Sequence, residues 1–286
     1  MAHGHPESSQ GDSTRDPSAS PPTDATNRSS TDPAAAFAGD SAGQPWAGRH
    51  FDTNSFAGDD GRAPEQLIEA LTLFRAGEAS QADVLDAVRD ARLLVPLVAH
   101  AGETDTDSHG RTIDKTQELS IVTVRAPDGR TALPAFTSTA AMAAWNPKAR
   151  PIPTAARRVA LAAAGESTDL MILDPTSATE FAVRRPALWA LAQGTEWHVP
   201  FDDPAVVAEF AASVAGESAV ASLALRAGDP DARLAAPEVV VELSLVPGLD
   251  RPALDALLAR LNSRWSASSL IGARVDSLAI KLLAAG

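Results

Sequence analysis

The sequence predicts an α+β protein with antiparallel or mixed sheets, flanking helices, two α+β units and a disordered N-terminal tail. The first observation is a hairpin pattern, in which the apolar runs 119–124 and 131–136 flank the turn residues Pro127-Asp128-Gly129. The second is a set of segments whose apolar residues recur with the period of an amphipathic helix. The third is the order helix, strand, strand, helix, strand after residue 200. Strand pairs with helices grouped beside them are typical of the α+β class.

The first unit begins with two helices and a strand. An apolar face predicts a helix at 64–76. Ser80 and Asp83 have the spacing of a capping box, which predicts a second helix to about residue 91. The apolar run 92–99 predicts a strand, and Pro96 places it near a sheet edge or at a bulge.

The remaining elements follow the hairpin. The first unit continues with a helix at 139–145, an irregular segment at 146–153, a helix at 154–164, strands at 169–173 and 180–184, and a helix at 186–193. The second unit has a helix from Pro204 that stops before Gly216, strands at 220–226 and 238–246, a helix at 252–265 and a last strand at 274–282.

Composition divides the chain into four regions. Residues 1–43 have almost no large apolar side chains, which predicts a disordered tail. Residues 44–62 form an aromatic lead-in segment, residues 63–200 the first folded region and residues 201–286 the second.

Charge and composition exclude several classes of function. The net charge of −13 over 286 residues argues against nucleic acid as a partner. No run of apolar residues is long enough to span a membrane, and the N-terminus has no secretory pattern. The absence of cysteine excludes disulfides and thiolate metal sites and favours a cytoplasmic protein.

The sequence contains no clear motif for a catalytic, cofactor or metal site. The sequence has no phosphate-binding glycine loop and no nucleophile elbow, so we expect no cofactor and lean towards a protein that is not an enzyme. His50, His100, His109 and His198 are interpreted as surface or packing residues. The loop 100–110 resembles the start of a calcium loop, but Thr116 stands where a bidentate Glu is needed. We interpret it as a solvated acidic loop and predict no metal.

A long acid-free segment carries the clearest candidate binding residues. Between Asp128 and Glu166 there are only basic charges, and a helix start follows Phe136. Free backbone N–H groups at a helix start, next to arginines, can bind an anion. The candidate anion- or partner-binding residues are Arg130, Thr137, Ser138, Thr139, Arg150, Arg157, Arg158, Arg184 and Arg185. The alternative is that these arginines pair with surface carboxylates and that the hydroxyls are ordinary helix caps.

The lead-in is a candidate linear motif for another protein. Its candidate residues are Trp46, Phe51, Phe56, Asp59 and Asp60. The alternative is an irregular segment whose aromatic side chains pack on the domain that follows. A further hypothesis places Asp59 and Asp60 on the arginines, namely Arg150, Arg157, Arg184 and Arg185, as an internal pseudo-ligand.

Several motifs resemble one family when taken in order. They are PWAGRHFDTNSFAGDDG, DGRTALPAFTSTAAMAAW, DLMILDP and FAVRRPALWALAQG. Together they resemble the SseB family, with its N-terminal domain in an actinobacterial form, over residues 44–200. The remaining residues are similar to the C-terminal part of such proteins. The resemblance implies two SseB-like α+β units, but it supplies no reaction, cofactor or catalytic residue.

These observations favour a non-catalytic cytoplasmic protein-binding or regulatory module with an unidentified protein partner. The alternative is a protein or enzyme that binds a small anion or metabolite at the helix start Thr137–Thr139 with nearby arginines.

Overall fold

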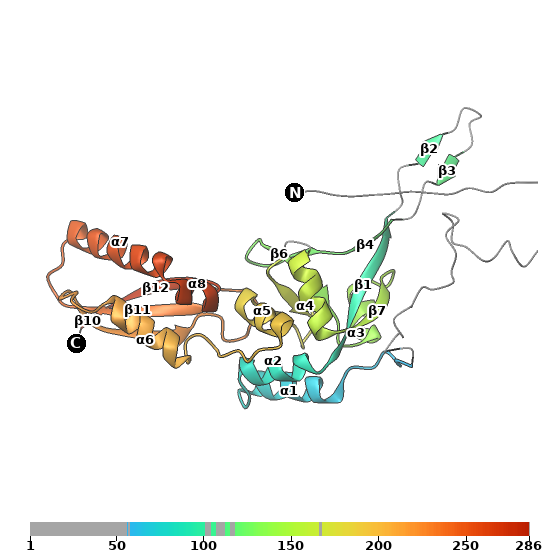
Figure 1. Cartoon of the computed structure of the whole chain (residues 1–286), viewed down its shortest axis with the longest axis horizontal. Helices are drawn as coiled ribbons and strands as arrows, with labels where there is room; N and C mark the ends of the chain where they lie inside the picture. The colour runs from blue at the N-terminus through green and yellow to red at the C-terminus, as the bar shows by residue number, and fades with distance from the viewer. Residues whose placement is uncertain are drawn as a thin grey trace, which may run out of the picture. The chain divides into compact units, whose positions relative to one another are not determined.

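The computed structural model describes residues 56, 58–100, 104–106, 112–114, 118–165 and 168–285. All of them belong to one compact unit, residues 55–286. This unit is α+β, as predicted, with helices beside antiparallel and mixed sheets (Figure 1). The predicted tail 1–43 and the lead-in up to residue 55 lie outside the described residues. The boundary at residues 200 and 201 stays a prediction.

The N-terminal part of the described chain, up to residue 193, contains both helices and strands. The helices are α1 (Glu65–Ala76), α2 (Gln81–Arg89), α3 (Thr139–Trp145), α4 (Ala156–Gly165) and α5 (Arg185–Gln193). The strands are β1 (Arg92–His100), β2 (Thr104–Thr106), β3 (Thr112–Asp114), β4 (Glu118–Ile121), β5 (Val124–Arg125), β6 (Thr131–Ala135), β7 (Arg150–Ala155), β8 (Met171–Leu173) and β9 (Phe181–Val183).

The C-terminal part, which begins after residue 200, has its own set of elements. They are α6 (Pro204–Ser213), β10 (Val220–Ala227), β11 (Val239–Leu245), α7 (Arg251–Ala267), α8 (Ser269–Arg274) and β12 (Leu278–Ala284). Its sheet has the order β10-β11-β12, with β10 antiparallel and β12 parallel to β11.

Two sheets of the N-terminal part meet at one bridge. One has the order β4-β1-β7, and the other has the order β5-β6-β8-β9 with β6 parallel to β8. Leu94 and Phe136 exchange backbone hydrogen bonds of 2.8 and 2.9 Å between β1 and the end of β6. The bridge fixes the start of α3 next to β1.

The predicted hairpin is correct only next to its turn. Val124 and Arg125 pair with Ala132 and Thr131, but the preceding strand β4 pairs with β1 instead. The single strand expected at 119–124 is therefore two strands in two sheets, because a run of apolar residues does not say which neighbour it will pair with.

Three other predictions were wrong in detail. The segment predicted as irregular contains β7, whose prolines Pro151 and Pro153 are accommodated because β7 is an edge strand. The last strand begins at Leu278, because α8 occupies residues up to Arg274. Pro96 lies in the middle strand of its sheet and not in an edge strand.

The pairing around Pro96 explains why a middle strand tolerates it. On the side away from β7, Leu94 bonds to Phe136 and pairing with β4 starts only at Leu97. Backbone N–H groups alternate between the two sides of a strand, so the missing N–H of Pro96 falls in this gap.

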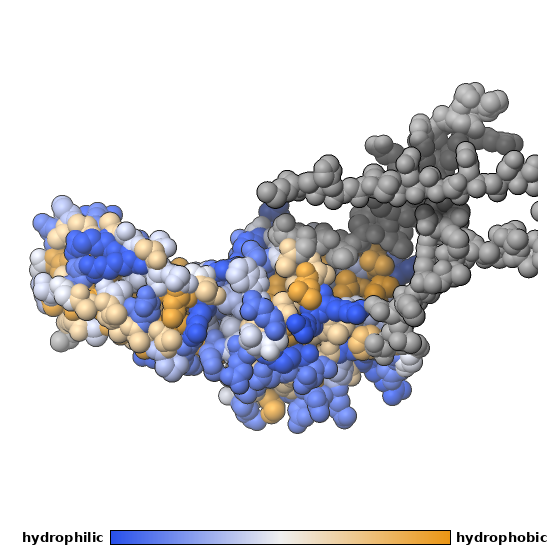
Figure 2. Space-filling view, viewed as in Figure 1, coloured by the Kyte–Doolittle hydropathy of each residue, from blue (hydrophilic) through white to orange (hydrophobic). Residues whose placement is uncertain are grey.

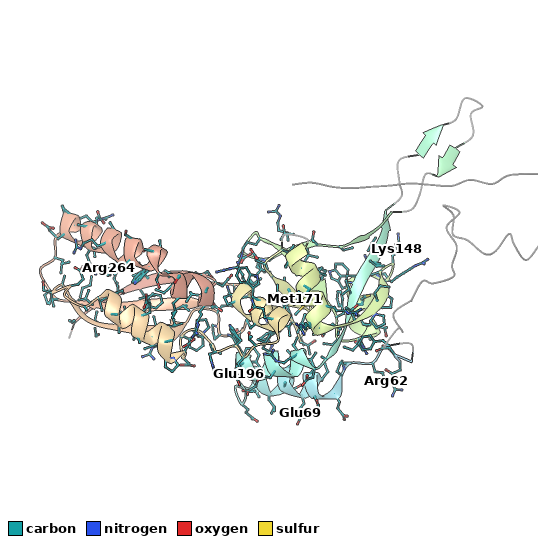
Figure 3. The ribbon with its side chains drawn as sticks, in the orientation of Figure 1. Arg62, Glu69, Lys148, Met171, Glu196 and Arg264 are labelled. Atoms are coloured by element: carbon teal, nitrogen blue, oxygen red, sulfur yellow. The ribbon has the colours of Figure 1, made fainter. Side chains whose placement is uncertain are left out.

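The main apolar core of the N-terminal part lies between its helices and strands, beside two smaller apolar clusters. Side chains of α1, α2, α4 and α5 pack on one face of the strands, and Met171 of β8 lies in the interior (Figure 3). The visible surface over α1 and α2 is mostly hydrophilic (Figure 2), although Leu73 of α1, Leu161 of α4 and Trp189 of α5 are exposed. The capping box of Ser80 and Asp83 is present at the start of α2, as predicted.

A separate core holds the C-terminal part together. Buried side chains of α6, α7 and α8 pack on the strands β10, β11 and β12. Phe210 of α6 and Trp265 of α7 have ring centroids 5.3 Å apart, and both are buried. The described residues include no helix with both the length and the apolar character that crossing a bilayer requires.

A buried carboxylate organises the junction between β6 and α3. The carboxylate of Asp174 accepts hydrogen bonds from the Thr137 N–H at 2.8 Å, the Thr137 hydroxyl at 2.7 Å and the Thr179 hydroxyl at 2.8 Å. Asp174 is 1% exposed and has a φ of 43°. Asp and Asn adopt this left-handed conformation more readily than most residues do, which suits Asp174 to the position.

We expect the substitution Asp174→Ala to lower the free energy of unfolding by about 3 kcal/mol, because it leaves buried donors without an acceptor. Asp174→Asn keeps one oxygen and tolerates the positive φ, so its loss is expected to be about half as large. Urea unfolding followed by tryptophan fluorescence measures both. Equal losses for the two variants would contradict this role of the carboxylate.

Candidate functional site

The predicted helix start at Thr137–Thr139 is satisfied from within the chain. Besides the Thr137 bonds to Asp174, the Ser138 hydroxyl accepts the N–H of Ala141 at 3.1 Å and caps α3. Thr139 donates to the carbonyl of Gly61 from its N–H at 2.9 Å and its hydroxyl at 3.2 Å. These contacts give no support to the alternative of a small-anion site here.

The predicted arginines have different surroundings. Arg130 and Arg184 meet at Asp276, whereas Arg157 donates to the carbonyl of Ala192 at 2.9 Å. Arg150 lies on β7 and Arg158 on α4, and both are exposed. The structure thus brings together two of the predicted arginines on an internal carboxylate.

The acidic end of the lead-in contacts other arginines than those hypothesised. Asp59 forms an ion pair with Arg92, and Asp60 forms one with Arg62 at 3.6 Å. Arg92 also donates to the carbonyl of Thr137 at 2.8 Å, so it ties the lead-in to the start of α3. The pseudo-ligand hypothesis is therefore corrected to Arg92, which sequence reasoning missed. Phe56 is among the described residues, whereas Trp46 and Phe51 are not.

A cluster of buried and half-buried ionisable side chains lies where β9 and α5 contact the C-terminal part. We call Arg130, Arg184, Asp229, Glu238 and Asp276 the junction cluster. Arg184 donates to Asp229 at 2.6 Å and to Asp276 at 3.0 Å, and its side chain is 5% exposed. Arg130 forms a bidentate pair with Asp276 at 2.9 and 2.8 Å. The cluster therefore pairs two guanidinium groups with two buried carboxylates, Asp229 and Asp276.

Local structure fixes each partner in the junction cluster. Arg184 is the N-cap residue of α5, directly after β9. Asp276 lies between α8 and β12. Asp229 follows β10 and accepts the backbone N–H of Leu234 at 2.7 Å, so it also shapes the loop before β11. These acids come from separate places in the sequence, and no motif pointed to them.

The pKa values of two carboxyl groups in the junction cluster, Asp276 and Glu238, are shifted in opposite directions. Burial opposes ionisation of Asp276, but hydrogen bonds from Arg130 and Arg184 outweigh it and hold the pKa of Asp276 below its usual value. Burial raises the pKa of Glu238 to about 7, although its carboxylate accepts the backbone N–H of Asp276 at 2.7 Å. Glu238 is thus a buried acid that titrates near neutral pH.

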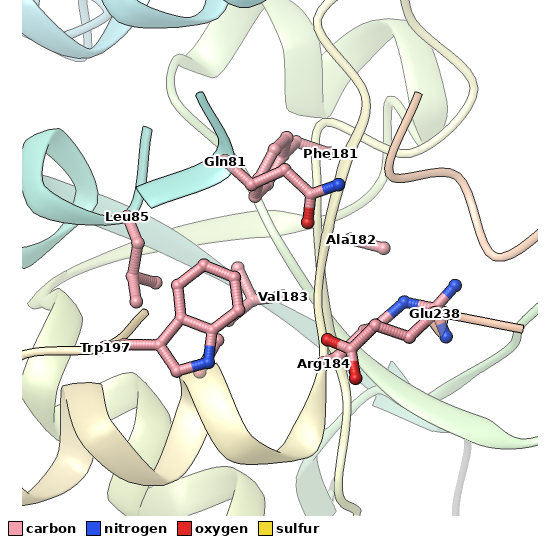
Figure 4. A pocket seen from close by; sticks show the side chains of 9 residues that line it. Gln81, Leu85, Phe181, Ala182, Val183, Arg184, Trp197 and Glu238 are labelled. Atoms are coloured by element: carbon pink, nitrogen blue, oxygen red, sulfur yellow. The ribbon is translucent and has the colours of Figure 1, made fainter. Parts of the chain in front are cut away.

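A small cavity adjoins Glu238. Its volume is about 10 Å³, which is close to the space that one water molecule needs. Oε1 of Glu238 and Nε1 of Trp197 are both buried there without a hydrogen-bond partner among the described residues. Figure 4 shows the indole of Trp197 and the carboxylate of Glu238 facing this space from opposite sides.

A larger groove lies on the other side of Trp197. Its volume is about 420 Å³, within the usual range for binding sites. The groove is lined by α5, the segment that follows it and the end of α8, through Pro186, Trp189, Ala190, Gln193, Thr195, Glu196, Trp197, His198, Asp203, Ala273 and Arg274. We call it the Trp189 groove.

Arg185 holds the exposed indole of the groove in place. Its guanidinium carbon lies 5.3 Å from the centroid of the Trp189 ring, a cation–π distance. The same guanidinium donates to the carbonyls of Gly272 at 2.9 Å and Val275 at 3.2 Å. Trp189 itself is 43% exposed. The predicted binding residue Arg185 therefore contributes to the groove by positioning Trp189.

The junction cluster and the Trp189 groove differ in chemistry, since the first consists of internal ion pairs and the second is an open, mixed polar and apolar surface. In the junction cluster Asp229 and Asp276 each accept a charge-assisted hydrogen bond from an arginine. In the part of the chain that the structure describes, no three His, Cys, Asp or Glu side chains are placed to hold a metal ion. The groove combines an indole with amide, imidazole and hydroxyl groups, which suits recognition of a chain segment.

Comparison with known proteins identifies the N-terminal part. Residues 67–190 match the family model of the SseB protein N-terminal domain, so the chain contains that domain. The match includes β9, Arg184 and Trp189 and ends before the C-terminal part. No curated protein and no solved structure matches the chain. The actinobacterial form and the similarity of residues 201–286 to the rest of the family stay predictions.

We expect Arg184→Met to lower the free energy of unfolding by about 3–5 kcal/mol, because it leaves Asp229 buried without its cation. Arg251→Met is the matched control, since Arg251 forms an exposed ion pair with Asp255 on α7. Its loss is expected to stay below about 1 kcal/mol. Urea unfolding measures both, and similar losses would show that the junction cluster is not a major source of stability.

The pKa of Glu238 predicts a pH dependence. Because its pKa is raised in the folded protein, Glu238 favours folding at low pH, and this contribution is lost as the pH rises through about 7. We expect Glu238→Gln to gain about 2 kcal/mol of stability relative to the unchanged protein between pH 5 and pH 8. Urea unfolding at both pH values measures the difference. Parallel pH profiles would refute the raised pKa.

Proposed function

We propose that this SseB N-terminal domain protein is a non-catalytic cytoplasmic protein-binding module that receives an extended segment of a partner protein in the Trp189 groove. The observation that carries the proposal is the exposure of Trp189, at 43%, beside a groove of about 420 Å³. A large aromatic surface left in water at a concave site is typical of a recognition surface.

The construction of the groove supports recognition of a protein. Tryptophan and arginine are the residues most enriched among those that dominate binding energy at protein interfaces. Here Arg185 stacks on Trp189 while its guanidinium also bonds to two backbone carbonyls. The indole is therefore held ready, and less conformational entropy is lost when a partner covers it.

The shape and the charges of the groove indicate the kind of segment. The lining combines an apolar ring with the polar side chains of Gln193, Thr195 and His198, which can bond to the backbone of an extended chain. Arg274 is paired with Asp203 at 2.6 Å, whereas Glu196 lies exposed at the surface (Figure 3). A segment with an apolar anchor next to a lysine or arginine fits this arrangement.

The cytoplasmic part of the proposal rests on composition. A chain of 286 residues without cysteine uses no disulfide, as is usual for proteins of reducing compartments. Its net charge of −13 favours protein partners with basic segments over nucleic acid.

We expect Trp189→Ala to weaken binding of extended peptides at least tenfold. Random peptides displayed on phage are selected on the full chain, and the enriched sequences are then titrated as labelled peptides by fluorescence anisotropy. A loss of this size corresponds to the removal of one interface hot spot of about 1.4 kcal/mol or more. The enriched peptides are expected to carry an apolar residue beside Lys or Arg.

Leu161→Ala provides the matched control. Leu161 lies on α4 and, at 54%, is more exposed than Trp189, but it does not line the groove. Its substitution is expected to change the affinity less than twofold. Peptides that bind the Trp189→Ala variant as tightly as the unchanged protein, or a selection that enriches no sequence, would contradict the proposed function.

A further inference from the structure

The described sheets differ in how their edge strands are protected. An exposed edge offers unpaired backbone groups to another chain, and proteins usually block it with prolines, bulges, short strands or covering segments. β7 contains Pro151 and Pro153, and β10 has a register shift between Val220 and Ser222. The N–H of Ala182 in β9 bonds to the carbonyl of Ala232 at 2.7 Å. Each of these three edges has a blocking feature.

The edge strand β12 lacks these features. It runs over seven residues without proline, in unbroken parallel register with β11. Leu278 and Ile280 are only partly buried, and Leu282 is 42% exposed. Among the described residues, β12 is thus a regular edge that nothing covers.

The pairing with β11 shows which backbone groups of β12 point outward. The N–H of Val239 bonds to the carbonyl of Ser277 at 3.1 Å, and the N–H of Ala285 bonds to the carbonyl of Leu245 at 2.9 Å. In a parallel pair the bonding residues alternate, so the odd-numbered residues of β12 bond to β11. The N–H and C=O groups of Leu278, Ile280 and Leu282 therefore point away from the sheet.

The apolar side chains of β12 lie in a row that is complementary to the same row of a second copy. Leu278, Ile280 and Leu282 lie on the same face, because side chains alternate along a strand. Lys281 is the charged residue of the strand, and its Nζ bonds to Oε1 of Glu242 on β11 at 2.9 Å. The ammonium group is thus drawn over the sheet and away from the open edge.

We propose that a second copy of this chain pairs with β12 in antiparallel orientation, with the twofold axis at Ile280. Ile280 then faces Ile280 of the second copy, and Leu278 faces Leu282. These residues carry the outward backbone groups, so each of these pairs exchanges both of its hydrogen bonds. The apolar stripes of the two copies become continuous across a six-stranded sheet formed from two three-stranded sheets.

The position of Lys281 disfavours the neighbouring register with the axis at Lys281. An axis at Lys281 places two like charges directly opposite each other, which is destabilising. With the axis at Ile280, Lys281 faces Ala279 of the second copy instead, and each Lys281 keeps its own Glu242. The edge is therefore complementary to itself in this register, which favours a second copy over an unrelated strand as the occupant.

Sedimentation velocity of the full chain over a range of concentrations tests the proposal. The unchanged protein is expected to form a dimer, and Leu282→Lys is expected to raise the dimer dissociation constant at least tenfold. Leu73→Lys on α1 is the matched control, because Leu73 is 37% exposed and distant in sequence from β12. Circular dichroism and a thermal melt establish that each variant is folded.

A protein that stays monomeric at all concentrations would overturn the proposal, and so would a dimer that Leu282→Lys leaves unchanged. In that second outcome the copies associate through another surface. Neither result bears on the binding of peptides in the Trp189 groove, which is measured separately.

The absence of cysteine allows a direct test of the register. Under mild oxidation Ile280→Cys is expected to form a covalent dimer, because residues directly opposite each other lie within disulfide range. Lys281→Cys places the sulfurs on diagonal neighbours about 7–8 Å apart, so it is expected to cross-link at least tenfold more slowly. Ser222→Cys on the other edge is the control for random collision. Cross-linking at equal rates would exclude this register.

Discussion

The structure depends on the buried guanidinium of Arg184. A charged group that is removed from water must be matched by opposite charge and by hydrogen bonds, because its desolvation costs several kcal/mol. Arg184 meets this requirement with acceptors that all come from the C-terminal part, Asp229, Asp276, Ser277 and the carbonyl of Ala236. The end of β9 is thereby fixed to the loops that flank β11 and β12. The groove beside α5 is lined from the C-terminal part by Ala273 and Arg274, which shortly precede Asp276 in the chain.

The same requirement explains the contacts of several polar groups in the acid-free, basic segment. The carboxylates of Asp128 and Asp276 pair with Arg130, and the carbonyl of Ala192 accepts a hydrogen bond from Arg157. Asp174 satisfies the polar groups of Thr137. Arg130 pairs with Asp128, its neighbour in sequence, but also with Asp276, and only the folded chain brings Asp276 to it.

The elements that depend on interactions between residues close in sequence were predicted correctly. The capping box at Ser80, the short helix α3 and the end of α5 at Gly194 all depend on residues within one or two turns, and each was predicted. The strand β4 was assigned to the wrong partner, because pairing with β1 depends on contacts that the hairpin pattern does not contain.

In the candidate site, too, local features were predicted from the sequence and long-range contacts were not. Arg184 and Arg185 were identified from the basic composition around them, but their partners and the role of Trp189 were not. Glu238 gave no sign in the sequence, since its raised pKa results from burial in the folded chain. The groove joins α5 to the end of α8, about eighty residues later, and no local pattern contains that contact.

The positions of Arg184 and Arg185 also bear on where the folding unit ends. The family model stops at residue 190, within α5, but the side chains at the start of this helix bond to residues 229–277. If the C-terminal part melted alone, Arg184 would lose all of these acceptors and Asp229 would lose its cation. The two cores are therefore coupled and should lose their structure in one cooperative transition. The border of the recognised domain marks where sequence similarity ends, while the contacts of its last helix continue beyond that border.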